Sequence, residues 1–139
     1  MDTWKALEKL YHDGRVRAIG VSNFHIQHLE RLLPEAEVIP AVNQVEFHPH
    51  LTQEGLRAFC EQQGIHLEAW SPLKRGQLLD HPILVSIAEK YGKNAAQVIL
   101  RWDVQHNVIT IPKSITPERI IQNAAIFDFA LTEEEMKQN

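Results

Sequence analysis

The chain has 139 residues, of which 44% are hydrophobic and 23% are charged, and its formal net charge is −4. This is the composition of a globular domain that is long enough to bury a core. The negative charge gives no reason to expect nucleic-acid binding, and no apolar run approaches the length of a membrane span. The single cysteine, Cys60, excludes an internal disulfide framework, and the start Met1-Asp2-Thr3-Trp4 is not a secretory signal. We therefore expect a cytoplasmic protein without a membrane segment.

Helix-spaced and strand-like apolar segments alternate over the first 70 residues. In chain order they are a helix with Trp4, Leu7, Leu10 and Tyr11, a strand at 16–21, a helix with Ile26, Leu29, Leu32 and Leu33, a strand at 38–45, a helix with Leu56, Phe59 and Cys60, and a strand at 65–70. Asp13-Gly14, Pro34 and Gly64 end the three helices, and Thr52 is expected to cap the third.

The alternation continues toward the C-terminus. In chain order there follow a helix at 82–91, a helix with Ala95, Val98, Ile99 and Trp102, a strand at 108–111, and a helix with Ile120, Ile121, Ala124 and Phe127 on its apolar side. Asn94 is the expected N-cap of the second of these helices, and Thr116-Pro117 opens the third. Thr132 and Glu135 form a capping box for a last helix, whose acidic run at 133–135 is expected to be solvated.

Strictly alternating strands and helices predict parallel strands with helical crossovers. The strand centres are apolar and uncharged, as in a sheet that is covered on both faces. No G-x-G-x-x-G follows any strand, so the fingerprint of the doubly wound dinucleotide-binding fold is absent. A complete eight-unit barrel needs roughly 250 residues. Four β/α units are half that number. We therefore expect residues 1–139 to be a piece of a larger architecture or a subunit that associates.

Polar or aromatic residues end each predicted strand, where β/α folds build their sites. These strand ends resemble the motifs of the aldo-keto reductase family. Residues 18–24 (AIGVSNF) resemble its (A/I)GVSNF segment, 43–46 its NQVE, 70–73 its aromatic-S-P-L, and 111–114 with Arg119 and Asn123 its IPKS-x4-R-x3-N signature. The motifs are also similar to those of bacterial aldo-keto reductases of the 2,5-diketo-D-gluconate reductase type. It implies that this α/β chain is the C-terminal half of a TIM (β/α)8 barrel, strands five to eight with their helices.

The resemblance further implies a reductase that converts small aldehydes or ketones to alcohols with NADPH, and that residues 1–139 are its cofactor-binding half. The residues that it assigns to the nicotinamide carboxamide are Ser22, Asn23 and Gln44, and Trp70 would stack on the nicotinamide ring. Those near the pyrophosphate would be Ser71, Leu73 and Arg75. Those at the 2′-phosphate would be Lys113, Ser114 and Arg119, and those facing the adenine would be Gln122 and Asn123. Position 122 is more often Glu in the family.

The chemistry of these residue types agrees with the roles. Amide side chains suit a carboxamide, which offers both a donor and an acceptor, and an indole can back one face of a flat ring. A dianionic phosphate favours a Lys, a hydroxyl, an Arg fork and a helix N-terminus together. Thr116-Pro117 places such an N-terminus directly after Lys113-Ser114.

Reduction of a carbonyl by hydride also needs an acid to protonate the developing alkoxide. In the family this acid is a Tyr supported by Lys, Asp and His, all from the N-terminal half, and the chain has no counterpart of them. Tyr11 and Tyr91 fall on predicted helices, away from the strand ends. We therefore predict no catalytic residue in this chain. The expected partner is a second copy of the chain or a missing N-terminal half that completes the barrel.

Other interpretations remain open at this point. The chain is alternatively an inactive half-barrel that binds nucleotide weakly or only self-associates. Trp70 alone is also typical of a core residue, Ser22-Asn23 of a helix cap, and Lys113 of a Schiff-base lysine. His48-Pro49-His50 resembles the H-x-H of metal-dependent barrel hydrolases. The later strand ends carry no further metal-ligating residues, so we predict no metal site.

Overall fold

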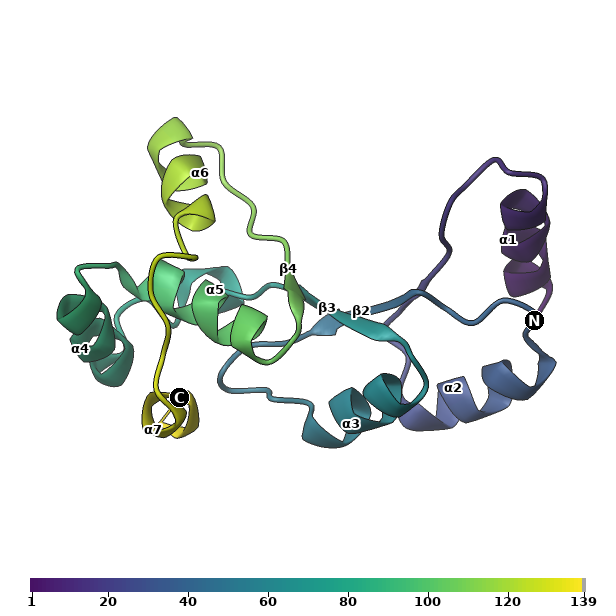
Figure 1. Ribbon diagram of the computed structural model, residues 1–139, viewed down its shortest axis with the longest axis horizontal. Coiled ribbons are helices and arrows are strands. Elements are labelled where there is room, and N and C mark those ends of the chain that lie inside the picture. The colour runs from purple at the N-terminus through teal and green to yellow at the C-terminus, as the bar shows by residue number, and fades with distance from the viewer. Residues whose placement is uncertain (139) are drawn as a thin grey trace. The chain divides into compact units, whose positions relative to one another are not determined.

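The computed structural model describes residues 1–138, in which helices and strands alternate as the sequence predicts (Figure 1). The elements are α1 (Asp2–His12), β1 (Val21–Ser22), α2 (Ile26–Leu32), η1 (Leu33–Glu35), β2 (Val42–Glu46), α3 (Glu54–Gln62), β3 (His66–Trp70), η2 (Lys74–Gly76), α4 (Pro82–Tyr91), α5 (Ala95–Gln105), β4 (Ile109–Thr110), α6 (Pro117–Ala124) and α7 (Glu133–Lys137). Within this part of the chain the sheet has four strands in the order β1-β2-β3-β4. The predicted α/β fold with a parallel sheet is confirmed.

The described chain divides into two compact units. The first unit comprises Met1–Val45 and Gln53–Glu68, and the second comprises Glu46–Thr52 and the chain from Ala69 onward. Each unit has its own buried residues. No helix among residues 1–138 combines the length and the hydropathy that a membrane crossing requires.

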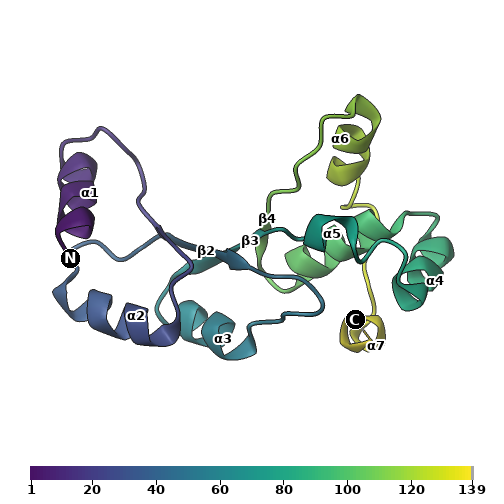
Figure 2. The same cartoon turned by 180° about the vertical axis from the view of Figure 1, so that it is seen from behind.

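The buried cluster of the first unit joins α1 and α2 to the segment that leads into β1. Trp4, Ile19 and Leu32 form the buried cluster, and Leu7 and Phe24 pack against it. Strand β1 runs parallel to β2 with Val21 opposite Asn43. Helices α2 and α3 lie on the same side of β2 (Figures 1 and 2).

The second unit is built around α5, which is the most deeply buried helix of that unit. Val98, Ile99 and Leu100 are fully buried. The Trp102 ring stacks on Phe47 with 5.0 Å between the ring centroids, and its indole nitrogen donates to the Met136 carbonyl at 3.1 Å. Through Trp102, α5 therefore packs against the segment before α3 and is hydrogen-bonded to α7.

A buried carboxyl group joins α5 to β4. Asp103 is inaccessible to solvent, and its Oδ2 accepts a hydrogen bond of 2.8 Å from the Thr110 hydroxyl. Burial raises the pKa of Asp103 well above its usual value, and the bond from Thr110 acts in the opposite direction. This contact fixes the end of β4 directly before the segment that carries Lys113 and Ser114.

Three of the predicted strands are shorter in the structure than in the sequence pattern. The strand expected at 16–21 is limited to β1, and only two of its residues pair with β2. The strand expected at 38–45 begins at Val42, because Pro40 has no N–H to donate to a ladder. The strand at 108–111 shortens to β4, whereas β3 matches its prediction to within one residue.

The apolar side predicted for α6 is exposed, and Phe127 lies beyond the end of the helix at Ala124. Ile120, Ile121 and Phe127 are 53%, 71% and 74% exposed, and no residue of α6 is buried. Amphipathic spacing sets which residues share a face, but it does not supply the surface that covers them. Within residues 1–138 no element lies over this face.

Two predictions about helix starts also need correction. Gln53, with a φ of 48°, is the N-cap of α3, so the expected cap Thr52 lies one residue too early. Glu135 is buried, at 7% exposure, whereas Glu133 and Glu134 are solvated as predicted. The caps at Asn94 and Thr132 are confirmed, since each side chain accepts a hydrogen bond from the backbone N–H three residues later.

Candidate functional site

A pocket of about 410 Å³ in the second unit gathers half of the predicted cofactor residues. Those that line it are Leu73, Lys113, Ser114, Arg119, Gln122 and Asn123. They come from the loop after β3, from the segment after β4 and from α6. The sequence motif predicts no distance between these positions, so their convergence is a result of the fold.

The N-terminus of α6 forms part of this pocket. Thr116 is its N-cap and Pro117 occupies its first turn, where a missing N–H costs nothing. The Thr116 side chain makes no capping bond. Instead, the Ser114 hydroxyl accepts a hydrogen bond of 3.3 Å from the Thr116 N–H. The first N–H groups of the helix therefore remain available beside Lys113 and Arg119.

The electrostatics of the pocket favour an anion. Lys113 and Arg119 are both exposed cations that line it, and none of the described lining residues is an Asp or a Glu. The positive end of the α6 dipole adds to their field. A lysine, an arginine fork, a hydroxyl and a helix N-terminus are the donor set that binds a phosphate.

The opposite wall of the pocket is the start of α5. Gln97 on this helix donates through its Nε2 to the carbonyl oxygens of Gln122, at 2.9 Å, and Ala125, at 3.2 Å. Gln97 is buried, so these bonds lie in a partly dry environment. They hold the C-terminal end of α6 against the N-terminal end of α5, as Figures 1 and 2 show.

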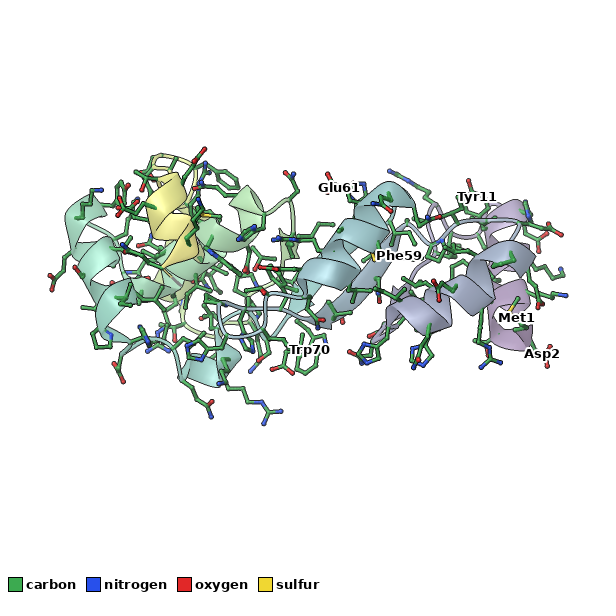
Figure 3. All side chains as sticks on the ribbon, turned by 90° about the horizontal axis from the view of Figure 1, so that it is seen from below. Met1, Asp2, Tyr11, Phe59, Glu61 and Trp70 are labelled. Carbon is green, nitrogen blue, oxygen red and sulfur yellow. The ribbon has the colours of Figure 1, made fainter. Side chains whose placement is uncertain are left out.

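The loop after β3 adopts an unusual backbone conformation. Ser71, Lys74 and Arg75 have φ angles of 52°, 46° and 54°, in the left-handed region that non-glycine residues seldom enter. Trp70 is half-buried at the end of β3, and Figure 3 shows its side chain projecting from the strand end. Of these predicted site residues, Trp70, Ser71 and Arg75 are not among those that line the pocket.

The other predicted residues belong to the first unit. Ser22 donates through its hydroxyl to the Gln44 carbonyl at 3.2 Å, and the Asn23 N–H donates to the same oxygen at 2.8 Å. The Gln44 amide nitrogen donates to Glu68 at 2.5 Å. The Gln44 amide oxygen is therefore the end of the side chain that can accept a hydrogen bond from a ligand. The structure therefore brings Ser22, Asn23 and Gln44 together at the adjacent ends of β1 and β2.

Asn43 holds this group in place, and the sequence reasoning did not assign it that role. It is fully buried, donates to the Phe24 carbonyl at 2.9 Å and accepts from the Phe24 N–H at 3.3 Å. A polar residue inside an otherwise apolar strand was the available signal. Asn43 also bonds the thiol of Cys60, whose pKa is raised by burial and lowered by this bond, with burial dominant.

His48 and Tyr91 are engaged in contacts with neighbouring side chains. His48 is buried, with its Nε2 3.0 Å from a Glu46 carboxylate oxygen, and its ring lies near His50. Among the described residues no three His, Cys, Asp or Glu side chains are arranged to hold a metal ion. The Tyr91 hydroxyl donates to Glu135 at 2.7 Å, and Tyr11 lies exposed on α1.

Comparison with known proteins shows what this chain is similar to. A sequence family described as the aldo/keto reductase family matches residues 1–139. A glyoxal reductase of Bacillus subtilis (strain 168) is 67% identical over 135 residues, which cover 97% of this chain and 49% of the relative.

Solved structures give the same result. An aldo/keto reductase from Brucella melitensis superposes with a TM-score of 0.92 at 50% identity, over 98% of this chain and 53% of that one. A variant of the protein Gox0644 in complex with NADPH has a TM-score of 0.94 at 44% identity, over 98% of this chain and 51% of that one. The chain thus spans about half the length of the relatives it matches, in agreement with the predicted half of a (β/α)8 barrel.

Proposed function

Because the chain belongs to the aldo/keto reductase family, we propose that its second unit binds the adenosine 2′-phosphate end of NADPH. The chain would be the cofactor-binding part of a reductase of small aldehydes and ketones. The observation that carries this proposal is the pocket in which Lys113, Ser114 and Arg119 meet the N-terminus of α6. The 2′-phosphate is the group that distinguishes NADPH from NADH, and this donor set suits it.

The residues present fit the cofactor in composition as well as in charge. Gln122 and Asn123 line the same pocket and offer amide groups to a nucleobase. In the first unit, Ser22, Asn23 and Gln44 form a polar group suited to a carboxamide. The chemistry that NADPH supplies when bound is hydride donation to a carbonyl carbon.

The names of two relatives support this proposal. One is called a glyoxal reductase, and another was solved in complex with NADPH. Glyoxal is a small dicarbonyl compound, which agrees with the substrate class that the motifs imply.

A second function is nucleotide binding without turnover. The Tyr91 hydroxyl donates to Glu135, and this bond is the main cause of the raised pKa of Tyr91, with burial second. A tyrosine in this state is a poor proton donor for an alkoxide. We therefore propose that turnover requires a proton donor outside these 139 residues. That donor would come with an N-terminal half or another partner that completes the barrel.

The buried, unpaired Cys60 thiol agrees with the cytoplasmic location that we propose for the chain.

The proposal is tested by the contribution of the 2′-phosphate to binding. Adenosine 2′,5′-bisphosphate and adenosine 5′-monophosphate differ only in that group, and calorimetry measures the affinity of each for the chain. We expect the bisphosphate to bind at least about tenfold more tightly, and Lys113→Met and Arg119→Met each to remove most of this difference.

Lys137→Met is the matched control, because Lys137 is an exposed lysine on α7 that does not line the pocket. It should leave the preference for the bisphosphate unchanged. Equal affinity for the two nucleotides in the unmodified chain, or an equal effect of all three substitutions, would contradict the proposal.

A further inference from the structure

The wall of the pocket contributed by α5 contains a polar side chain that none of the motifs includes. Asn94, the N-cap of α5, lines the pocket together with Gln122. Its Oδ1 accepts a hydrogen bond of 2.9 Å from the Gln97 N–H. A backbone N–H is always a donor, so this contact determines which end of the Asn94 amide carries the oxygen.

The orientation of Asn94 determines the orientation of Gln122. The Asn94 Nδ2, as the remaining end of the amide, donates to the Gln122 Oε1 at 3.3 Å. The Gln122 amide oxygen is thereby engaged, and its amide nitrogen has no hydrogen-bond partner among residues 1–138. The backbone of Gln122 is held separately, since its carbonyl accepts from Gln97 at 2.9 Å.

From this chain of contacts we infer that Asn94 is a positioning residue that sets the hydrogen-bonding polarity of the nucleobase end of the pocket. With its oxygen held by Asn94, Gln122 presents N–H donors to the ligand. A glutamine without this neighbour presents either end of its amide equally well. The pocket therefore selects a base edge that bears acceptor atoms, such as a ring nitrogen of a purine.

This inference rests on the proposed function, because it takes the ligand to be an adenine nucleotide. It assigns a role to Asn94 beyond capping, and the two roles can be separated by substitution. Asn94→Asp keeps a cap of equal length but replaces the donor by a carboxylate oxygen, so Gln122 must turn its nitrogen away from the pocket. Asn94→Ser keeps a cap but is too short to reach Gln122.

The experiment compares two ligands on the full chain by calorimetry, adenosine 2′,5′-bisphosphate and ribose 2,5-bisphosphate, which lacks the base. We expect Asn94→Ser to weaken the adenosine ligand about tenfold and the ribose ligand by less than about twofold. Asn94→Asp also adds a negative charge to the anion-binding pocket, so it should weaken both ligands, and the adenosine ligand about tenfold more than the ribose ligand. Thermal unfolding should change little, because Asp and Ser cap a helix about as well as Asn. In a chain that already carries Gln122→Ala, Asn94→Ser should have no further effect.

Three outcomes would overturn the inference. Equal losses for both ligands would mean that Asn94 acts only on the shape or stability of α5. Unchanged affinity for the adenosine ligand would mean that the orientation of Gln122 does not matter. Failure of the unmodified chain to bind either phosphate ligand would overturn the inference together with the proposed function, and it is distinguishable because it precedes any substitution.

Discussion

Gly20 has no room for a side chain beside β2. A Cβ atom placed on it would lie 2.7 Å from the Val42 carbonyl oxygen, a backbone atom that cannot move without shifting β2. We predict that Gly20→Ala separates the chain around Ile19 and Val21 from β2. The expected cost is about 1–3 kcal/mol of unfolding free energy, the usual range for overpacking.

Gly55 supplies a matched control for this prediction, because it lies in α3 and its nearest neighbour would be the Ile26 Cδ1 at 4.0 Å. Gly55→Ala should stabilise the chain by about 0.5–1 kcal/mol, since alanine loses less conformational freedom in a helix. Urea denaturation measures both substitutions. A Gly20→Ala variant as stable as the unmodified chain would contradict the prediction, because it would show that a Cβ atom fits between residue 20 and β2.

At the level of whole elements, α7 is held to α4 through one carboxylate. Glu135 accepts from the Lys90 ammonium at 2.6 Å, from the Tyr91 hydroxyl at 2.7 Å and from the Thr132 N–H at 2.9 Å. Burial raises the pKa of Glu135, but the bonds from Lys90, Thr132 and Tyr91 outweigh it and bring the pKa to about 2. Ionised Glu135 therefore stabilises the docked helix.

We predict that Glu135→Gln lowers the unfolding free energy at neutral pH by about 1–3 kcal/mol, because buried donors lose their charged acceptor. The folded-state pKa is below the ordinary value of 4.5, so the contribution is complete above 4.5 and is lost as the pH falls toward about 2. The difference between the variant and the unmodified chain should shrink over that range. Trp102 fluorescence is a suitable probe, since its indole bonds the Met136 carbonyl.

Glu134→Gln is the control, because Glu134 lies on the same helix and is solvated. It should change stability by less than about 0.5 kcal/mol. A loss at Glu134 equal to that at Glu135 would mean that the net charge of α7, and not the buried contact, stabilises this helix.

The sequence predicted which elements exist better than it predicted what covers them. Periodicity located every strand and the helix starts at Asn94 and Thr132, because those signals are local. Periodicity did not predict the features that depend on contacts between residues far apart in the sequence. The length of β1 depends on how far β2 pairs with it, and the apolar side of α6 needs a covering surface. The burial of Glu135 was not predicted, because its partners Lys90 and Tyr91 are remote in sequence.

The same distinction between local signals and long-range contacts applies to the candidate site. Motif resemblance identified Lys113, Ser114 and Arg119, and the fold places them around one pocket. The site roles of Asn43 and Asn94 were not predicted, because their contacts with Phe24 and Gln122 join segments that no local pattern connects.

For the molecule as a whole, the exposed apolar face near α6 predicts association. Ile115, Ile120, Ile121 and Phe127 are all more than half exposed, which is uncommon for a cluster on a solitary domain. We expect the purified chain to self-associate at micromolar concentration, and Ile121→Lys with Phe127→Lys to shift it to monomer. Sedimentation velocity measures this, and Ile83→Lys on α4 is the control, because Ile83 is only 39% exposed. A monomer before any substitution would contradict the prediction.

The measurement that tests the central claim most directly is the ratio of the dissociation constants of NADH and NADPH for this chain, obtained by fluorescence titration. The two cofactors differ only by the phosphate that Lys113, Ser114 and Arg119 are proposed to bind. The account predicts that NADPH binds at least about tenfold more tightly, and that the ratio approaches one when Lys113 and Arg119 are both replaced by Met. Equal binding of the two cofactors to the unmodified chain, or no binding of either, would contradict it.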